Sequence, residues 1–510
     1  MVGYRLSSLG SLLHRRGLLA SEPLPAHGGD ADPDIAAVRY DSRLVGPGDL
    51  FVARRGRHAD GHDHVGDAVR AGAGAVVVER PLPGIDVPEL VVRDARVALG
   101  LAAAWRAGDP SRTLGIVGIT GTDGKTTTAY LVRAIFEAAG RRTGLLGTTD
   151  VIVGGESLGN APRTSTPEAP ELQGHLAAMR EGGDAWAVIE STSHGLAQQR
   201  VAGVAYDVAV LTNVTSEHLE FHGTLDAYRA AKRSLFERLA VSEENPEKGW
   251  GKHAVVNADD AEGEAAAAIA EAVGATVLRY GSALDGGRSG GANRDLEATS
   301  LSETPARLHV GMRSPGWSGT ASLRLAGRFN TYNALAAMGV AQAIGLDLDA
   351  AAAALGELDA VPGRMQRIDE GQTFSVVIDY AHTAGSLATV LDELAPPPPG
   401  GLIAVFGSAG DRDRSKRAPM GRVAAERCRL VIVTDEDPRS EEREAILEDI
   451  ALGAEAAGRR RGDDLLLIAD RDAAIAEAMR RARPGDVVLL AGKGHEKTIE
   501  TSAGEVAWDE

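Results

Sequence analysis

The sequence predicts an α/β protein of three domains, built around a P-loop-type, mainly parallel sheet with helices on both faces. Strand-like and helical patterns alternate over residues 112–358, and a glycine-rich turn there joins a buried strand to a helix. Further strands after residue 359 end in charged residues. We therefore expect a small N-terminal α/β domain (1–111), a central domain (112–358) and a Rossmann-like C-terminal α/β domain (359–510).

The composition indicates a globular protein that acts on small molecules. A formal net charge of −18 argues against nucleic acid or an anionic membrane as partner, because either calls for a basic surface. The single cysteine, Cys428, excludes an intrachain disulfide and is typical of a reducing compartment. Neither a long apolar run nor a signal-peptide pattern is present. We expect a cytoplasmic monomer with no membrane partner.

The N-terminal domain is predicted from two apolar runs with a helix between them. Residues 49–53 and 75–79 have the pattern of strands, and residues 67–71 that of a helix. The tripeptide 109–111, Asp-Pro-Ser, is typical of a linker to the next domain.

The stretch 114–128 predicts a phosphate site. Residues 114–119 form an apolar run typical of a buried strand, three glycines follow at three-residue spacing, and Lys125 opens a helix. Glycines let backbone N–H groups crowd around phosphate oxygens, Lys125 reaches the outer phosphates, and the Thr126 hydroxyl is placed for Mg²⁺. We expect an ATP site; a glycine-rich turn that binds nothing is the alternative. The expected contacts are Gly121, Thr122, Asp123, Gly124, Lys125, Thr126 and Thr127.

Two helices of the central domain show a predicted buried face. The first carries Val132, Ile135, Phe136 and Ala139 at helical spacing and ends at Gly140. The second, over residues 226–236, carries Tyr228, Lys232, Leu235 and Phe236, with Arg229 and Arg233 pointing elsewhere. A lysine on a buried face must pair, lose its charge or be modified. The alternative is a lysine whose ammonium reaches the rim.

Polar residues follow two apolar runs of the central domain. The run 186–190 ends in Glu190, and the run 208–211 leads to His218. The carboxyl ends of parallel strands meet at one edge, so both clusters are expected beside the phosphate loop. Glu190 and His218 could hold a second cation there, although a lone glutamate at a strand end is often a surface residue or a cap. We assign no function to the exposed loop expected at 283–297.

The third domain is predicted to begin near Asp359. Its expected strands are 375–378, 402–406, 430–433 and 487–490, with a stiff connector at 396–399. Each strand leads into a charged run, and these runs are 379–382, 410–413, 435–439 and 492–496. Four charged strand ends predict a second ligand site, facing the first across a cleft.

Motifs along nearly the whole chain, in order, resemble those of the Mur ligase family. The form G-x-x-G-x-x-G-K-T-T resembles the ATP loop that this family shares with folylpolyglutamate synthetases, with Asp123 where Asn is usual. The run 40–53, with D-S-R and then G-D-L-F-V-A, resembles a signature of the MurE type, whose N-terminal domain holds uridine diphosphate. The run 379–385 resembles D-Y-A-H-T-P-D but ends in Ala384 and Gly385.

The resemblance implies roles for particular residues. The catalytic set comprises Lys125, Glu190, His218 and Lys232. The metal set comprises Thr126, Glu190, His218 and Lys232, the lysine carbamylated by CO₂. Beyond the loop, ATP would meet Asn330, Asn333, Arg364, Asp379 and His382, although asparagine there could simply cap a helix. The UDP-substrate would meet Ser42, Thr164, Ser165, Thr192, Gln198 and Arg200. The incoming amino acid would meet Arg412, Asp435, Asp437, Arg439, Gly492 and Glu496.

The implied activity is the ATP- and Mg²⁺-dependent addition of a diamino acid to UDP-muramoyl-dipeptide through an acyl phosphate. Arg439 favours diaminopimelate, because its guanidinium suits a distal carboxylate that lysine and ornithine lack. Glu436 and Asp437 suit L-lysine or L-ornithine instead, and Arg439 could pair with one of these acids.

Two other classes of function stay open. A folylpolyglutamate synthetase would not be expected to carry the N-terminal domain with Asp41, Ser42 and Arg43. A catalytically silent nucleotide-binding relative is suggested by the departures at Asp123, Ala384 and Gly385.

Overall fold

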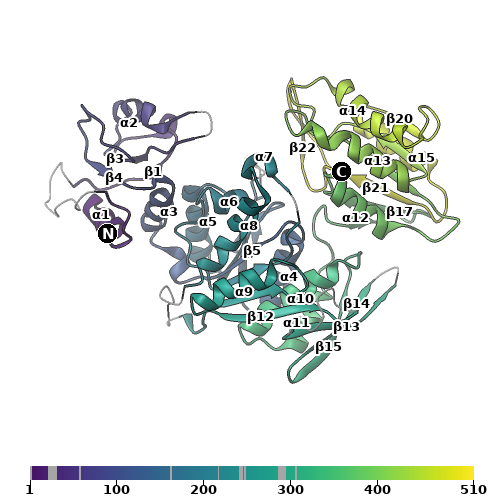
Figure 1. The fold of residues 1–510 in the computed structure, drawn as a ribbon, viewed down its shortest axis with the longest axis horizontal. Coiled ribbons are helices and arrows are strands. Elements are labelled where there is room, and N and C mark those ends of the chain that lie inside the picture. Colours follow the sequence, from purple (N-terminus) through teal and green to yellow (C-terminus); the bar gives the residue numbers. More distant parts are fainter. Residues whose placement is uncertain are drawn as a thin grey trace. The chain divides into compact units, whose positions relative to one another are not determined.

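A computed structural model of the chain describes residues 3–20, 32–56, 59–160, 164–215, 217–240, 245, 248–284, 294–304 and 307–510. The chain divides into two compact units. Figure 1 labels the helices and strands along the chain. The first comprises residues 1–297, 313–317 and 335–351, and the second comprises 298–312, 318–334 and 352–510. Among the described residues, none of the helices combines the length and the apolar character needed to cross a bilayer.

The first unit begins with a four-stranded parallel sheet. Its strands, in spatial order, are β1 (Val38–Arg39), β2 (Leu50–Val52), β3 (Ala75–Val78) and β4 (Glu89–Val91). The helices are α1 (Leu6–Arg15), α2 (Val65–Arg70) and α3 (Ala95–Arg106). Side chains of β3 alternate between two cores: Val77 packs with residues of α1 and α3, and Val76 packs with residues of α2. The predicted strands and the predicted helix are confirmed.

The predicted linker at residues 109–111 forms a packed turn, and the domain boundary there stays a prediction. Residues Pro110–Arg112 form a 3₁₀ helix in which Ser111 is buried, and the Ser111 hydroxyl accepts from the Ala205 N–H at 3.0 Å. Asp109 adopts a left-handed φ of 46°. Proline and serine marked the turn correctly, but its packing depends on Ala205, which is far away in the sequence.

The central sheet has the spatial order β15-β14-β13-β12-β11-β10-β5-β9-β6-β7-β8. Its strands are β5 (Gly115–Thr120), β6 (Thr143–Leu146), β7 (Val151–Val153), β8 (Glu156–Ser157), β9 (Trp186–Glu190), β10 (Val208–Leu211), β11 (His253–Asn257), β12 (Thr276–Ser282), β13 (Leu296–Glu303), β14 (Leu308–Ser314) and β15 (Trp317–Leu323). The run from β12 to β6 is parallel, and β7 and β8 are antiparallel. Both polar strand ends, after β9 and after β10, therefore flank β5.

Helices cover both faces of this sheet, as predicted. The helices are α4 (Lys125–Ala138), α5 (Ala169–Glu181), α6 (Ser193–Ala197), α7 (Leu219–His222), α8 (Leu225–Glu237), α9 (Gly263–Ala272), α10 (Asn330–Ala343) and α11 (Leu348–Leu355). Residues of α5, α8 and α9 share a core with one face of the strands, and α4 packs against β6 and β9. On α4 the predicted buried residues are buried except Ala139, which is exposed beyond the last turn.

Part of the predicted loop 283–297 belongs to the sheet. Its residues 285–293 lie outside the described residues. Leu296 and Glu297 are instead the first residues of β13, and the Leu296 side chain is fully buried.

The second unit contains a six-stranded sheet of order β16-β17-β21-β18-β19-β20. These strands are β16 (Gln366–Ile368), β17 (Ser375–Asp379), β18 (Leu402–Phe406), β19 (Leu430–Val433), β20 (Leu465–Leu467) and β21 (Val487–Ala491). All pair in parallel except β16 with β17. The four predicted strands are confirmed, whereas β16, β20 and the hairpin β22 (Thr498–Thr501) with β23 (Gly504–Ala507) were not predicted.

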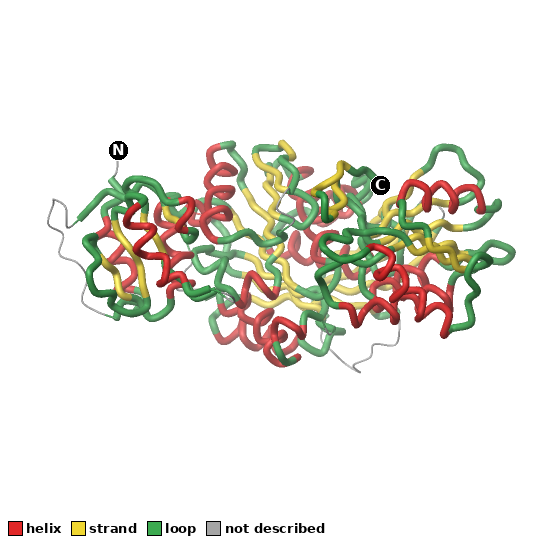
Figure 2. The backbone as a smooth tube through the Cα atoms, turned by 90° about the horizontal axis from the view of Figure 1, so that it is seen from above, coloured by secondary structure: helices red, strands yellow, loops and turns green. Residues whose placement is uncertain are grey.

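This sheet is also covered on both faces, as Figure 2 shows for the helices that flank its strands. The helices are α12 (Ala384–Leu394), α13 (Arg417–Arg427), α14 (Arg443–Ala456) and α15 (Arg471–Arg481). Residues of α12, α13 and α14 share one core with the strands, and residues of α15 share the other. The carboxyl ends of β17, β18, β19 and β21 therefore lie at one edge, but the cleft toward the first unit stays a prediction.

Gly118 in β5 provides a test of this packing. A Cβ atom there would lie 2.4 Å from the Tyr206 ring and 3.1 Å from Leu235, and both side chains are fully buried. We expect Gly118→Ala to lower the free energy of unfolding by about 1–3 kcal/mol through overpacking, measured by thermal unfolding. Gly174→Ala in α5 is the matched control, because no heavy atom lies within 4 Å of its Cβ position. Equal unfolding temperatures for both variants would contradict the packing described for β5.

Candidate active site

The phosphate loop adopts its turn because β10 holds it. Gly121 has φ 153°, and a Cβ there would lie 1.8 Å from the Thr212 hydroxyl. That hydroxyl donates to the Asp123 carbonyl at 2.6 Å, and the Asn213 side chain accepts from the Asp123 N–H at 3.0 Å. Gly124, at φ 81°, is the N-cap of α4. The turn therefore presents backbone N–H groups at a helix N-terminus, as an anion site requires.

Two lysines meet the same loop carbonyl. Lys125 Nζ donates to the carbonyls of Gly121 at 3.0 Å and Thr122 at 2.8 Å. Lys232 Nζ donates to the Gly121 carbonyl at 2.5 Å and lies 4.4 Å from the Tyr228 ring centroid. The side chain of Lys232 is buried, so the rim alternative is wrong. Burial, and next the charge of Lys125, hold the pKa of Lys232 well below its ordinary value.

Glu190, at the end of β9, is a buried carboxylate beside the loop. Its Oε2 accepts from the hydroxyls of Thr126 at 3.0 Å and Thr148 at 2.9 Å, and its Oε1 accepts from the Thr148 N–H at 2.8 Å. In the part of the chain that the structure describes, no lysine or arginine pairs with it. A fully buried carboxylate beside a hydroxyl fits a hard divalent cation. Sequence reasoning missed Thr148, although it follows strand β6 at the same sheet edge.

His218 lies in a histidine cluster at α7. Its ring centroid is 4.6 Å from that of His194, and its ring nitrogens lie 3.5 Å from Glu217 and 3.5 Å from Glu220. Ligand atoms of His194, His218 and Glu220 lie within 4.8 Å of one another. Burial, with the neighbouring His218 and His222, lowers the pKa of His194 to about 4. The predicted grouping of His218 with Glu190 in one metal set stays a prediction.

The strand end after β9 also holds the predicted substrate arginine. Arg200 donates to the Thr166 carbonyl at 2.8 Å and to Gln198 at 3.3 Å, and it pairs with Glu168 at 3.2 Å. Thr192 shares a hydrogen bond with the Thr166 hydroxyl at 3.0 Å and caps α6. The structure therefore brings together Thr192, Gln198 and Arg200.

Two further predicted substrate residues lie just before α5, and one of them, Ser165, contacts Thr148, which bonds Glu190. The Ser165 hydroxyl bonds that of Thr148 at 2.7 Å, and the backbone carbonyl of Thr164 accepts from Asn160 at 3.4 Å.

Ser42 lies in a short 3₁₀ helix of the N-terminal sheet region. The flanking residues Asp41 and Arg43 form an exposed ion pair at 2.6 Å, and the hydrogen bond from Arg43 lowers the pKa of Asp41 to about 2. The contact of Ser42 with the UDP-substrate stays a prediction.

In the second unit, two predicted ATP contacts lie in the first turn of α10. Asn330 and Asn333 are buried, and Asn333 donates to the Asn330 side chain at 2.8 Å. Asn330 donates its side-chain amide to the Ala326 carbonyl at 2.5 Å, which stabilises the helix start.

The loop after β17 is organised by Asp379. Its carboxylate accepts from the N–H groups of Met365 at 2.9 Å and Ala381 at 2.8 Å. The Arg364 guanidinium lies 4.8 Å from a neighbouring tyrosine ring centroid, and His382 Nδ1 lies 3.0 Å from a backbone carbonyl. These contacts position the loop, whereas its contacts with ATP stay predictions.

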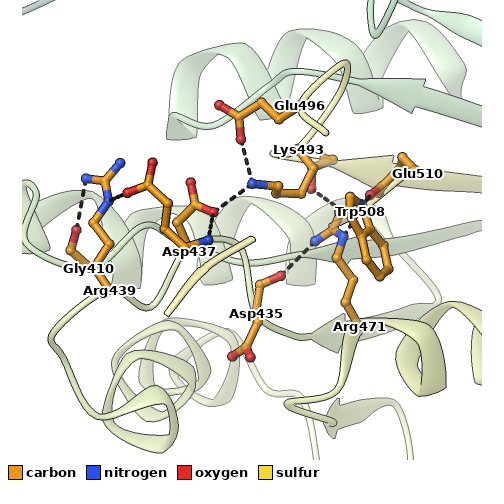
Figure 3. Close-up of polar contacts among 11 residues, drawn as sticks. Gly410, Asp435, Asp437, Arg439, Arg471, Lys493, Glu496, Trp508 and Glu510 are labelled. Carbon is orange, nitrogen blue, oxygen red and sulfur yellow. Dashed lines mark hydrogen bonds and ion pairs between the residues drawn. The ribbon is translucent and has the colours of Figure 1, made fainter. Parts of the chain in front are cut away.

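At the carboxyl ends of β19 and β21, a buried lysine neutralises two predicted site acids (Figure 3). The Lys493 side chain is fully buried and donates to Asp437 at 2.7 Å and to Glu496 at 2.6 Å. Asp437 also accepts from the Glu500 N–H at 2.8 Å. Lys493 was not predicted as a site residue, although it stands beside Gly492 in the predicted motif.

Arg439 is held by a residue outside its own motif. Its Nε donates to Glu500 at 2.8 Å, and its Nη1 donates to the Gly410 carbonyl at 3.4 Å. The alternative in which Arg439 pairs with Glu436 or Asp437 is therefore wrong. Arg439 pairs instead with Glu500, which lies in β22, a strand that was not predicted. The backbone of Arg439 has a left-handed φ of 53°, and Arg412 on the neighbouring loop is exposed.

Glu436 and Asp435 complete this edge. Glu436 is 7% exposed, and its Oε2 has no hydrogen-bond partner within the described ranges. A Cβ at Gly492, whose φ is 100°, would lie 3.1 Å from that oxygen. Asp435 pairs with Arg443. The buried Glu436 oxygen therefore suits an ammonium group, which is the partner expected for Glu436 from the sequence, although Glu436 was not among the predicted amino-acid contacts.

The phosphate loop, the buried carboxylate and the buried lysine define a nucleotide-dependent enzyme of the P-loop type. The sequence matches the descriptions "Mur ligase family, catalytic domain" over residues 34–104, "Mur ligase middle domain" over 119–341 and "Mur ligase, glutamate ligase domain" over 363–494. The chain belongs to the Mur ligase family, and it is an ATP-dependent ligase that acts with Mg²⁺.

Similar proteins span nearly the whole chain. A UDP-N-acetylmuramyl-tripeptide synthetase of Roseiflexus sp. (strain RS-1) is 49% identical over 95% of both chains. A UDP-N-acetylmuramoyl-L-alanyl-D-glutamate–2,6-diaminopimelate ligase of Geobacillus kaustophilus is 39% identical over 92% of this chain and 91% of its own. The solved structure of a ligase with that same name is 31% identical, with a TM-score of 0.64 over 93% of each chain.

Proposed function

We propose that this chain joins meso-diaminopimelate to the D-glutamate carboxylate of UDP-N-acetylmuramoyl-L-alanyl-D-glutamate, with cleavage of ATP, in peptidoglycan synthesis. The observation that carries this proposal is the shared edge of β5, β6 and β9, where the phosphate loop meets Glu190 and Lys232. The charge of −18 supports small-molecule partners, and we expect a cytoplasmic monomer. A folylpolyglutamate synthetase is disfavoured, because residues 34–104 match the Mur ligase family.

The reaction needs two displacements. A D-glutamate carboxylate oxygen attacks the γ-phosphorus of ATP, and the bond between that phosphorus and the β–γ bridging oxygen breaks. ADP departs, and the substrate carboxylate has become an acyl phosphate. The amine of the amino acid, after losing a proton, attacks the acyl carbon, and the resulting tetrahedral intermediate expels phosphate as the amide forms. Lys125 and the loop N–H groups stabilise the charge on the transferred group, while Arg200 orients the substrate carboxylate.

Thr126 and Glu190 would hold the Mg²⁺ that the family requires. When bound, Mg²⁺ would neutralise phosphate charge. In the structure, Glu190 accepts a hydrogen bond of 3.0 Å from the Thr126 hydroxyl and so orients it, and Thr148 donates to both oxygens of Glu190.

Lys232 is proposed to act as a carbamate. Burial lowers its pKa, which favours the neutral amine, and that amine adds CO₂ to give an N-carboxylate with release of one proton. The new carboxylate would add a negative oxygen ligand beside the phosphate loop, where Lys232 already reaches the Gly121 carbonyl at 2.5 Å.

Diaminopimelate is favoured by the charges at the β19 end. Lys493 already neutralises Asp437, so Asp437 is a poor partner for the terminal ammonium of lysine or ornithine. Glu500 holds Arg439 through Nε, and Nη2 donates no hydrogen bond to the described residues. The guanidinium edge suits the distal carboxylate of diaminopimelate, and Glu436 suits an ammonium.

Turnover with meso-diaminopimelate, L-lysine and L-ornithine tests this choice. We expect diaminopimelate to have the highest kcat/KM, and Arg439→Ala to lower it roughly 100-fold, because a bidentate charge contact is lost. Arg461→Ala is the control, since Arg461 pairs with Glu448 and Glu455 on the surface. A higher kcat/KM for lysine or ornithine, with a ranking that Arg439→Ala leaves intact, would show that Arg439 does not select the substrate.

A further inference from the structure

The last residue of the sequence is built into the carboxyl edge of the second unit's sheet (Figure 3). The Glu510 side chain is 2% exposed, and its carboxylate forms an ion pair with Arg471, whose side chain is fully buried. Arg471 Nε donates to Glu510 Oε2 at 2.9 Å, and the Trp508 indole N–H donates to the same oxygen at 2.7 Å. Three donors from two segments therefore fix this carboxylate.

Arg471 connects Glu510 to the two strand ends that carry the proposed amino-acid contacts. Its Nη1 donates to the Asp435 carbonyl at 2.9 Å, and its Nη2 donates to the Ala491 carbonyl at 2.9 Å. Asp435 opens the run that continues to Arg439, and Ala491 immediately precedes Gly492. In the sheet, β18 lies between β19 and β21, so the guanidinium ties together two strand ends that do not pair.

The charge of Arg471 makes these bonds depend on Glu510. Within the described ranges, Glu510 is the carboxylate that forms an ion pair with Arg471. A buried guanidinium that loses its carboxylate is strongly destabilised, so it must turn toward solvent or toward another acid. Either movement withdraws the donors from the Asp435 and Ala491 carbonyls, and both loops lose an anchor.

A second connection reaches the site along the hairpin. The backbone N–H of Trp508 donates to the carbonyl of Lys497 at 2.8 Å, and Lys497 follows Glu496 in the chain. Strand β22 then supplies Glu500, which holds Arg439 and bonds Asp437. Residues 508–510 therefore hold the segment 491–497 at both ends. Glu510 holds Arg471, which bonds the Ala491 carbonyl, and Trp508 bonds the Lys497 carbonyl.

We propose that Glu510 is a positioning residue for the amino-acid site, acting through Arg471 on the loops that begin at Asp435 and Gly492. This inference rests on the proposed function, since it assigns those loops to the incoming diamino acid. Glu510 itself does not touch the substrate; it fixes the geometry of the groups that do.

The test compares KM for the three substrates in Glu510→Gln and in a variant lacking residues 508–510. We expect KM for meso-diaminopimelate to rise about tenfold or more, with KM for ATP and for the UDP-dipeptide within about twofold of the unchanged enzyme. Asp509→Asn is the matched control, because Asp509 is 79% exposed and pairs with the exposed Lys497. Trp508→Phe, which removes one donor and keeps a ring, should raise the same KM two- to threefold.

An unchanged KM for diaminopimelate in Glu510→Gln would overturn the inference. A parallel loss for all three substrates, together with a lower unfolding temperature, would also overturn it by showing a general structural role. If the unchanged enzyme turns over no diamino acid, the proposed function fails as well; if it turns over diaminopimelate and Glu510→Gln does the same with equal KM, only the positioning role fails.

Discussion

Lys232→Ala is expected to reduce ligase turnover by about 10³-fold or more while ATP binding stays measurable. The physical reason is the loss of carbamate oxygens from a buried position beside the phosphate loop, where Lys232 reaches the Gly121 carbonyl. Short carboxylic acids such as formate or acetate should restore part of the activity, because they return a carboxylate to the space that the side chain leaves. The measurement is steady-state ADP release at increasing carboxylate concentration.

Arg233→Ala is the control for this prediction. Arg233 is the next residue of α8, but it points toward Glu262 at 3.7 Å and not toward the loop. Full activity in Lys232→Ala would contradict the carbamate role. Two results together would assign Lys232 a role as an amine. One is loss of activity in Lys232→Ala that carboxylic acids do not restore, and the other is the absence of a carbamate ¹³C signal when the unchanged enzyme is placed in ¹³CO₂.

Glu190→Gln should slow acyl-phosphate formation strongly, with a fall in kcat of about 10²–10³-fold. The substitution keeps the shape of the side chain but removes the buried negative charge that suits a divalent cation. It also turns one acceptor oxygen into an amide donor, which faces the Thr126 hydroxyl or the Thr148 N–H. The single-turnover burst of ADP in the presence of UDP-dipeptide and absence of amino acid isolates this step.

Glu237→Gln, on the exposed side of α8, is the matched control. A normal ADP burst in Glu190→Gln would mean that this carboxylate serves only to hold Thr126 and Thr148. An increased Mg²⁺ requirement in Glu190→Gln, with the burst recovered at high Mg²⁺, would support the metal role directly.

Local patterns in the sequence were enough to predict the phosphate loop and the buried face of α8. Glycine spacing and helical periodicity are local signals, and the structure confirms that Tyr228, Lys232, Leu235 and Phe236 are buried together. The meeting of the β9 and β10 ends beside β5 was also predictable, because parallel strands present their carboxyl ends at one edge.

The charge pairing of the amino-acid site was not predictable in this way. Arg439 pairs with Glu500, which is 61 residues away and lies in a hairpin of intermediate and exposed residues without a clear strand signal. Lys493 was overlooked because a lysine between two glycines reads as a loop residue, whereas tertiary packing buries it between Asp437 and Glu496. Such pairs depend on which strand ends the fold brings together.

ADP release by the purified protein, with each substrate omitted in turn, tests the central claim most directly. We predict sustained release over many turnovers only when ATP, Mg²⁺, UDP-N-acetylmuramoyl-L-alanyl-D-glutamate and meso-diaminopimelate are all present, with a product whose mass equals that of the two joined substrates less one water. Release that depends on a folate and glutamate instead, or no release with any of these substrates, would contradict the assignment.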